Sequence, residues 1–286
     1  MGFPKSQIDG KTQVYGILGN PVRHSLSPLM HNALFGQHNI NACYLPFEIE
    51  KGSLKLTLEA IRVLKIKGVN ITVPFKEEAA ALVDEIPDAL DRSIGAINTV
   101  TNQDGKLLGF NTDVTGFVTA LKTDLNFSAQ GKSVLVLGAG GSARSVVFAS
   151  AREEASEIWI HNRHPERAEK LAEYTRGFFP MRSIQALTDL KTMPKVDLVV
   201  NCTSCGLKAE DPCVFDLDIL KGKPAIYDLI YSPRQTKLLE SAGDRGFPRA
   251  NGLGMLATQG ALSFELWMGK KKGTRDTMQK ALKKCL

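Results

Sequence analysis

The chain has 286 residues, 43% of them hydrophobic and 23% charged, and a net charge of +6 at pH 7. That length favours two domains over one, and the composition is that of an ordinary soluble protein. Aromatic and basic residues are not interleaved as nucleic-acid binding would favour, and no apolar run is long enough to span a bilayer. The polar start also lacks the apolar core of a signal peptide, so we expect a cytoplasmic protein without nucleic-acid or membrane partners. Gly2 and Ser6 match a myristoylation pattern, but so short a pattern often arises by chance.

The cysteines are expected to be reduced, because their number is odd and no secretion signal precedes them. They are Cys43, Cys202, Cys205, Cys213 and Cys285. Cys202 and Cys205 form a C-x-x-C pair, a spacing used for zinc and for redox chemistry. A closed zinc site needs four ligands, and only Cys213 lies nearby. We therefore predict ordinary buried thiols and no metal.

The first hundred residues alternate short apolar runs with helical periodicity. Residues 14–19 and 42–49 are expected to form strands, and residues 27–38 and 53–66 helices. This β-α-β-α order predicts an α/β domain with a mainly parallel sheet.

A helix is predicted from Pro74, after the strand-like stretch 68–72. Pro suits a first helical position, and an apolar stripe follows at i, i+4, i+7 and i+11. The stripe is Phe75, Ala79, Leu82 and Ile86. Lys76 falls in the first turn, where acidic residues are favoured, and lies at the edge of this stripe. Taken alone, it would be interpreted as a surface lysine neutralised by Glu77 and Glu78.

Residues 96–111 are expected to form a hairpin around Asp104-Gly105, a dipeptide typical of tight turns. A helix over 114–125 and a polar connection follow. Asp113 directly precedes this helix, so it is either an N-cap or a functional carboxylate.

The second unit begins with a buried strand that runs into Gly138, Gly140 and Ala143, a G-x-G-x-x-A turn that opens a helix and leads to a strand over 157–163. The first glycine allows the tight turn, the second lets the backbone approach a pyrophosphate, and the helix N-terminus supplies N–H donors. A glycine-rich turn without a ligand is the alternative. Further strands over 196–202 and 224–231 and a helix over 232–246 complete a Rossmann-like dinucleotide-binding domain.

The end of the second strand indicates which dinucleotide is bound. NAD-binding folds place an acidic residue there to bind the ribose 2′-OH, whereas this chain has Asn162 followed by Arg163 and Arg167. Arg stacks on adenine and pairs with phosphate, so NADP is favoured. Solvent-facing arginines at a helix start are the alternative.

Residues 251–267 predict a long helix, which packs either on the first domain or on the Rossmann-like one. Gln259 shares an apolar stripe with Met255, Leu262 and Leu266, where a buried amide needs hydrogen-bond partners.

Other polar residues suggest a site in the first domain. Ser27 precedes Pro28 and is expected to cap the following helix, and with Ser25 it also offers two hydroxyls to a carboxylate. Asn70, Thr72 and Asn98 lie at strand ends, where α/β sheets place ligand groups. His24 and His31 are more simply interpreted as surface or packed histidines.

These motifs, in order along nearly the whole chain, resemble those of shikimate dehydrogenase and the related quinate/shikimate dehydrogenases. The matching stretches are "HSLSPLMHNALF", "GVNITVPFKEE", "GAINTVTNQDGKLLGFNTD", "GAGGSARS", "NRHPERAEKLA", "NCTSCGL", "YDLIYSPRQTKLLE" and "NGLGMLATQGALSFELW". The resemblance implies an NADP-dependent, reversible reduction of 3-dehydroshikimate to shikimate. It also implies a substrate domain of residues 1–113 and 251–286 around an NADP domain of residues 114–250.

The resemblance further implies a role for each matching residue. Ser25 and Ser27 would hold the substrate carboxylate, and Lys76 and Asp113 would form the catalytic pair. Asn70, Thr72, Asn98 and Gln259 would bind the ring hydroxyls, and Tyr227 would lie near the substrate and the nicotinamide. The cofactor-binding residues would be Gly138, Ala139, Gly140, Gly141, Ser142, Ala143, Asn162, Arg163, Arg167, Thr203 and Gly252.

Two features of the function stay open at this point. The chain departs from the family pattern on the cofactor side, at Ser142, His164, Cys202, Cys205 and Leu207, so some use of NAD is an alternative. A quinate/shikimate dehydrogenase and a non-catalytic NADP-binding sensor of the same fold are the alternative functions. The oligomeric state is not decided by the sequence, and we expect a monomer or a homodimer.

Overall fold

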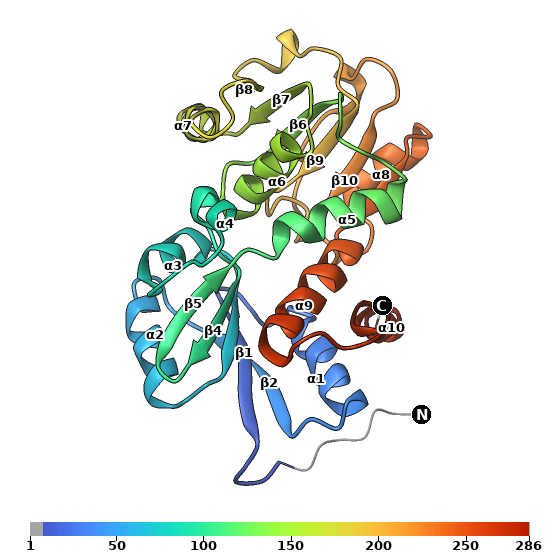
Figure 1. Cartoon of the computed structure of the whole chain (residues 1–286). Helices are drawn as coiled ribbons and strands as arrows, with labels where there is room; N and C mark the ends of the chain where they lie inside the picture. Colours follow the sequence, from blue (N-terminus) through green and yellow to red (C-terminus); the bar gives the residue numbers. More distant parts are fainter. Residues whose placement is uncertain (1–7, 286) are drawn as a thin grey trace. The chain divides into compact units, whose positions relative to one another are not determined.

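The computed structural model describes residues 8–285, apart from the side chains of Lys191 and Cys285. Gly2 and Ser6 therefore lie outside the described residues. The chain divides into two compact units, Met1–Thr112 with Ala257–Leu286 (unit 1) and Asp113–Leu256 (unit 2) (Figure 1). The second boundary falls inside a long helix, α9, which spans Leu253–Met268.

Unit 1 is built on a five-stranded sheet with the order β2-β1-β3-β4-β5. Its strands are β1 (Gln13–Gly19), β2 (Ala42–Glu48), β3 (Gly68–Ile71), β4 (Thr99–Gln103) and β5 (Lys106–Phe110). The first three strands are parallel, and β4 and β5 add an antiparallel hairpin. Asp104 and Gly105 both have positive φ, 50° and 95°, as the predicted tight turn requires.

The helices of unit 1 bury one face against this sheet or against one another. They are α1 (Ser27–Gln37), α2 (Leu54–Val63), α3 (Lys76–Leu82), α4 (Ala89–Ile94), the larger part of α9, and α10 (Thr274–Cys285). One core cluster joins Leu58 of α2, Phe75 and Val100. Because α10 packs against α1, the C-terminal helices complete unit 1.

The helix predicted from Pro74 differs from the expectation at both ends. It begins at Lys76, with Phe75 as its N-cap residue, and it ends at Leu82. Ile86 still packs against the same core, but it lies beyond the helix. The chain becomes extended at Val83 because the next residues bond to the hairpin: the Asp84 N–H donates to the Leu107 carbonyl at 3.0 Å.

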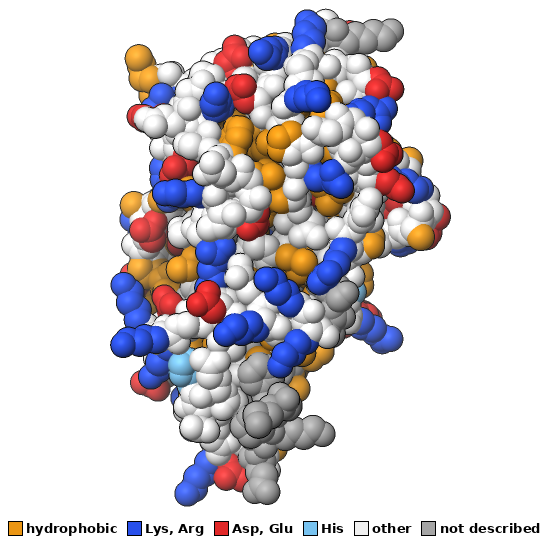
Figure 2. All heavy atoms as spheres, turned by 90° about the vertical axis from the view of Figure 1, so that its right-hand side faces the viewer, with side chains coloured by type: hydrophobic (Ala, Val, Ile, Leu, Met, Phe, Trp, Pro, Cys, Tyr) orange, Lys and Arg blue, Asp and Glu red, His pale blue; other side chains and the backbone are white. Residues whose placement is uncertain are grey.

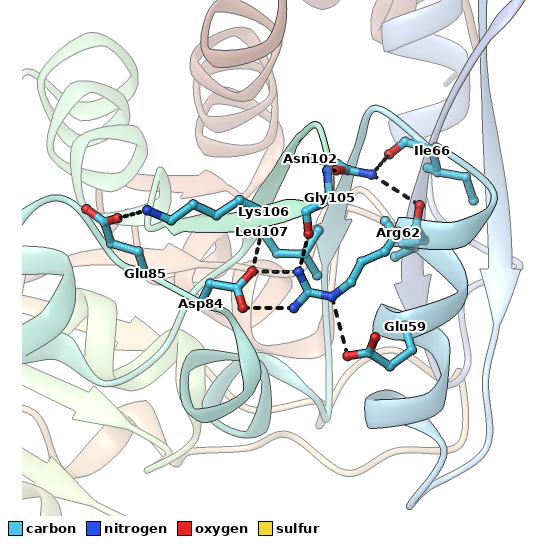
Figure 3. A network of polar contacts seen from close by, with 10 residues as sticks. Glu59, Arg62, Ile66, Asp84, Glu85, Asn102, Gly105, Lys106 and Leu107 are labelled. Atoms are coloured by element: carbon cyan, nitrogen blue, oxygen red, sulfur yellow. Dashed lines mark hydrogen bonds and ion pairs between the residues drawn. The ribbon is translucent and has the colours of Figure 1, made fainter.

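Arg62 of α2 fastens this extended segment to the rest of unit 1 (Figure 3). Its guanidinium binds both carboxylate oxygens of Asp84, at 2.6 and 3.1 Å, and also donates to the carbonyl of Gly105 in the hairpin turn. Asp84 accepts in addition from the Leu107 N–H at 2.7 Å. The group of Arg62, Asp84 and the turn at Gly105 is called the hairpin brace below.

Unit 2 contains a six-stranded sheet, parallel at every pairing, with the order β11-β10-β9-β6-β7-β8. The strands are β6 (Ser133–Leu137), β7 (Glu157–His161), β8 (Ser183–Ala186), β9 (Leu198–Asn201), β10 (Ala225–Asp228) and β11 (Arg249–Asn251). Counted from β6, this is the order 3-2-1-4-5-6 of dinucleotide-binding folds. The predicted Rossmann-like domain is confirmed, and its third and sixth strands, β8 and β11, were not predicted from the sequence.

The helices of unit 2 are α5 (Asp113–Leu125), α6 (Gly141–Arg152), α7 (Pro165–Arg176) and α8 (Lys237–Asp244), with short 3-10 turns at Leu190–Thr192 and Leu217–Ile219. Its core includes Leu135, Val199 and Ile226 from three neighbouring strands.

Lys and Arg side chains are spread among acidic ones on the face drawn in Figure 2. Over residues 8–285, no helix is long and apolar enough to cross a membrane.

Candidate active site

The two serines predicted to hold a carboxylate lie at the start of α1, Ser25 in the loop before it and Ser27 in the helix, but Ser27 does not cap the helix as expected. It is the first residue of α1, and the N-cap residue is Leu26, which makes no side-chain capping bond. The Ser27 N–H instead donates to Ser25 Oγ at 3.3 Å. Among residues 8–285, no hydrogen bond to the Ser27 hydroxyl is found, although this residue is buried. Since it caps no backbone N–H, the Ser27 hydroxyl is available to a ligand.

Three of the predicted substrate-binding residues are linked side by side in unit 1. Asn70, at the end of β3, donates from Nδ2 to the Asn98 carbonyl at 3.0 Å. Asn98 donates from its own Nδ2 to Gln259 Oε1 on α9 at 3.1 Å, and its Oδ1 accepts from the Thr112 N–H at 2.8 Å. Residues far apart in the sequence therefore form one amide cluster, defined as Asn70 and Asn98, which are buried, and Gln259, which is half-buried.

Four further residues complete this cluster and were missed from the sequence. Tyr44 donates its hydroxyl to Asn70 Oδ1 at 2.7 Å, and the Asn98 amide donates to Thr112 Oγ1 at 2.8 Å. Thr99 Oγ1 and Ser263 Oγ are 2.7 Å apart. Ser and Thr within strand and helix patterns carry no signal of their own, although Ser263 stands four residues after Gln259 on the same helix.

The predicted apolar stripe through Gln259 is only partly right. Met255 is buried, but Leu266 is 40% exposed and Gln259 itself is half-buried. The deeply buried face of α9 instead carries small residues and Phe264. Gln259 is therefore marked as a candidate site residue by its hydrogen bond with Asn98 and not by its position on an apolar stripe.

Lys76 and Thr72 are close to this cluster through their backbone: Thr72 is two residues after Asn70, and Lys76 bonds to the residue before Asn98. Thr72 directly follows β3, and its N–H donates to the Leu18 carbonyl of β1 at 2.9 Å. Lys76 is 9% exposed, and its carbonyl accepts from the Ile97 N–H at 3.0 Å, next to Asn98. A lysine this well covered is not the solvated surface residue that its charge alone would indicate.

His24 and His31 are a surface and a packed histidine, as predicted. His24 is exposed, and His31 is fully buried, with its ring stacked on Tyr44 at 4.4 Å and 6°. Burial lowers the pKa of His31 to about 3. His31 is therefore neutral at ordinary pH, and so low a pKa makes it a poor proton acceptor.

In unit 2, the glycine-rich turn after β6 has the geometry that a dinucleotide needs. Gly138 has φ +112°, and a Cβ there would lie 3.3 Å from the Cys202 carbonyl oxygen. Gly140 is the N-cap residue of α6, and a Cβ built on it meets nothing within 4 Å. Ala139, Gly141 and Ser142 are half-buried, and Ala143 is fully buried. The turn thus combines an obligatory left-handed residue with open backbone.

The residues predicted to recognise the 2′-phosphate lie after β7. Arg163 and Arg167 are exposed, and Asn162 is half-buried with its Nδ2 donating to the His164 carbonyl at 3.0 Å. Within residues 8–285 neither arginine has an ion-pair partner. Their exposure fits both phosphate binding and the solvent-facing alternative, so this role stays a prediction.

Thr203 belongs to a second buried network that the sequence did not reveal. Its N–H and hydroxyl donate to Asn201 Oδ1 at 3.0 and 2.8 Å, and Asn201 Nδ2 donates to Asp228 Oδ1 at 3.0 Å. Asp228 also accepts from Thr236 Oγ1 at 2.6 Å, and burial raises the pKa of this carboxyl. The network holds the loop that packs against Gly138.

Three remaining predicted site residues lie in unit 2. Tyr227 is fully buried within β10, its ring edge-on to Phe117 at 5.8 Å. Asp113 is 4% exposed and is the first residue of α5 itself, not a residue before it. Gly252 lies so close to Leu229, the residue after β10, that a Cβ would be 2.0 Å from the Leu229 carbonyl oxygen, so packing requires a glycine there.

The cysteines with described side chains form no disulfide bond, but they are not buried as predicted: Cys43, Cys202 and Cys205 are half-buried, and Cys213 is exposed. Partial burial raises the pKa of the Cys205 thiol. In the described part of the chain, no group of His, Cys, Asp and Glu residues has the arrangement of a metal site.

The Rossmann strand order, the glycine-rich turn and the polar cluster of unit 1 define an α/β protein of the dinucleotide-dependent dehydrogenase class. Three family models match the chain: the shikimate dehydrogenase substrate binding domain over residues 17–100, shikimate / quinate 5-dehydrogenase over 120–209, and the shikimate 5'-dehydrogenase C-terminal domain over 252–283. The chain belongs to the shikimate dehydrogenase family, as its motifs predicted.

Individual relatives agree with the family models. A shikimate dehydrogenase (NADP(+)) of Aquifex aeolicus is 43% identical over 92% of this chain and 93% of its own length. A solved shikimate dehydrogenase in complex with NADP+ is 34% identical, with a TM-score of 0.89 over 99% of both chains. The solved shikimate 5-dehydrogenase of Thermus thermophilus, in complex with NADP(H) and shikimate, is 35% identical, with a TM-score of 0.82 over 96% of this chain and 100% of its own.

Proposed function

We propose that this protein catalyses the reversible, NADP-dependent reduction of 3-dehydroshikimate to shikimate. The observation that supports this most directly is the amide cluster of unit 1, because Asn70, Asn98 and Gln259, which the resemblance assigns to the substrate, are linked by hydrogen bonds: the Asn70 side chain donates to the Asn98 carbonyl, and the Asn98 side chain donates to that of Gln259. Amides both donate and accept, which suits a ring bearing several hydroxyls.

The substrate carboxylate is assigned to Ser25 and Ser27 beside the start of α1. The free Ser27 hydroxyl and the positive end of the helix support this assignment. Thr72 and the amide cluster then bind the ring hydroxyls, with Tyr227 near the ring and the nicotinamide. In this proposal the substrate domain, residues 1–113 and 251–286, corresponds closely to unit 1.

Unit 2 holds NADP. The backbone from Gly138 to Ala143 approaches the pyrophosphate, and Arg163 and Arg167 pair with the 2′-phosphate beside Asn162. Thr203 and Gly252 line the cofactor in this assignment. Loaded NADPH supplies the hydride that the ketone carbon accepts.

Reduction of the ketone also needs a proton on the carbonyl oxygen, because hydride addition leaves an alkoxide there. Lys76, as an ammonium, donates this proton, and in the reverse direction its amine removes it from the alcohol. Asp113 orients Lys76 and stabilises its positive charge. Support for these two roles comes from the burial of both side chains, since buried ionisable groups are uncommon outside functional or paired positions.

The nearest alternative is a quinate/shikimate dehydrogenase that also uses NAD, which the family model over residues 120–209 includes by name. Steady-state rates with shikimate and quinate, each with NADP+ and NAD+, separate the two. We expect the highest kcat/KM for shikimate with NADP+. A comparable kcat/KM for quinate would favour the alternative, and no oxidation of either acid would contradict both. Action in the cytoplasm as a monomer or homodimer is part of the same proposal.

A further inference from the structure

Ser263, on α9, has more side-chain partners than a buried helical serine needs. It is 0% exposed, and its Oγ lies 3.0 Å from Asn70 Nδ2 on β3 and 2.7 Å from Thr99 Oγ1 on β4. It also lies 3.3 Å from Thr112 Oγ1 and 3.0 Å from the Gln259 carbonyl oxygen. Only the last of these bonds is the usual local one, from a serine to the carbonyl four residues earlier.

Ser150, on α6, is a buried helical serine that makes only the usual local hydrogen bond among the described residues. It is 1% exposed, and its hydroxyl donates to the carbonyl of Val146, four residues earlier, at 2.8 Å. No other hydrogen bond to the Ser150 hydroxyl is found among the residues that the structure describes. The additional partners of Ser263 are therefore not a general property of buried helical serines.

The proton of the Ser263 hydroxyl can be placed by counting donors and acceptors, since a hydroxyl has one proton and two lone pairs. If it donates to the Gln259 carbonyl, it accepts from Asn70 Nδ2 and, over 2.7 Å, from the Thr99 hydroxyl. The Thr112 hydroxyl then donates to Asn98 Oδ1 at 3.2 Å. Every hydroxyl of the cluster has an acceptor in this arrangement.

Removing Ser263 Oγ would redistribute these bonds. The acceptor left to the Thr99 hydroxyl is Asn98 Oδ1, at 3.2 Å, which already accepts from the Thr112 N–H at 2.8 Å. Asn70 would lose one of the three acceptors around its Nδ2. Both amides that are assigned to the substrate would thus be held less firmly.

We propose that Ser263 is a positioning residue for substrate binding, whose hydroxyl holds Thr99 and Asn70 so that the amides of Asn70 and Asn98 are oriented toward the ring hydroxyls. This inference rests on the proposed function. Ser263 acts through Asn70 and Asn98 and does not touch the substrate itself. Because these amides bind shikimate and not the cofactor, loss of the Ser263 hydroxyl should raise the KM for shikimate and leave the KM for NADP+ unchanged.

The test compares Ser263→Ala with Ser150→Ala, a matched loss of one buried helical hydroxyl. We expect Ser263→Ala to raise the KM for shikimate about fivefold, the effect of one lost hydrogen bond, with kcat and the KM for NADP+ nearly unchanged. Ser150→Ala should leave both KM values as in the wild type. Thermal unfolding of each variant confirms that the fold is kept.

Thr99→Val, which removes the other hydroxyl of the 2.7 Å bond, provides a second measurement. Its KM for shikimate should rise similarly. In the double variant Ser263→Ala/Thr99→Val, the fold-increase in this KM should be smaller than the product of the two single fold-increases. If Ser263→Ala fails to fold, Thr99→Val alone decides in the same way. The proposal is overturned by an unchanged KM for shikimate, by an equal rise for both substrates, or by the same rise in Ser150→Ala. Absence of shikimate oxidation by the wild type would instead contradict the proposed function.

Discussion

A lysine in the first turn of a helix is unusual, because the backbone N–H groups there favour acidic side chains. Lys76 shares that turn of α3 with Glu77 and Glu78, both exposed, yet it is itself 9% exposed. The residue pattern alone indicated a surface lysine, and only the family resemblance marked it as catalytic. Burial of one residue depends on what packs over it, which a local pattern does not contain.

Replacing Lys76 with Ala should lower kcat about a hundredfold or more, since the proton donor is lost, while the Kd for shikimate changes little. Steady-state kinetics and equilibrium binding of shikimate measure the two quantities. Lys55→Ala is the matched control, because Lys55 is an exposed lysine in the first turn of α2. A Lys76→Ala enzyme with near-normal kcat would remove Lys76 from the mechanism.

His31 carries a pH dependence of stability. Its folded pKa, about 3, lies below the ordinary histidine value of 6.5, so between these values the unfolded chain binds a proton that the folded chain does not. Stability should therefore fall as the pH drops below 6.5, by about 2 kcal/mol between pH 7 and pH 5 from this residue.

His31→Leu should remove that part of the slope and be neutral or stabilising at pH 7, because both ring nitrogens of His31 lack a hydrogen-bond partner in the described chain. Urea unfolding of the wild type and of the variant from pH 7 to pH 5 measures the difference. Parallel stability curves would show that His31 does not titrate as its burial implies.

Short elements depend on tertiary contacts more than on their own sequence. The Pro74 helix was predicted to reach Ile86 because the apolar spacing continues, but hydrogen bonds to β5 draw the chain away after Leu82. Likewise β8 and β11, with the sequences SIQA and RAN, were not predicted, because so few of their residues are apolar that they show no strand pattern. Longer elements with clear periodicity, such as α5 and α9, were predicted.

The hairpin brace should contribute measurably to the stability of unit 1. Arg62→Met keeps the apolar stem and removes the bidentate contact with Asp84 and the bond to Gly105, so we expect a loss of about 1 kcal/mol, reduced by salt because both groups are partly exposed. Arg23→Met is the control, since Arg23 is 89% exposed and its 3.6 Å pair with Glu48 should contribute little.

The same substitution has a predicted pH signature. Arg62, by its hydrogen bond, lowers the pKa of Asp84 below 3.8, so its stabilisation is present above that value and lost as the pH falls through the folded pKa. The stability difference between the wild type and Arg62→Met should shrink below about pH 4. Urea unfolding at pH 7 and pH 3 checks this, and a difference of equal size at both would exclude the ion pair as its cause.

At the scale of the whole chain, the sequence predicted two α/β units and their family, and both are confirmed. The β-α alternation, the glycine-rich turn and its strand context were sufficient for this. The buried polar networks were not predictable, because Ser263 meets Asn70 across a long stretch of sequence and the meeting depends on the fold. Roles that join residues of the two units, such as the pair Lys76 and Asp113, stay predictions.

Unit 2 is continuous in sequence and has its own sheet and core, so a fragment of residues 113–256 should fold by itself. We expect one cooperative thermal transition by circular dichroism and binding of NADP+ by calorimetry. A fragment that lacks a cooperative transition would show that unit 2 needs the rest of the chain to fold.

The amide cluster also has a spectroscopic consequence. Asn70 and Asn98 are both buried, and their side-chain amide groups are bonded to neighbouring oxygens, so these protons should exchange with deuterium far more slowly than those of exposed asparagines. After transfer to heavy water, their nitrogen-proton resonances would remain in a nearly empty region of the spectrum. The same side chains would then act as built-in reporters of ligand binding, without any added label.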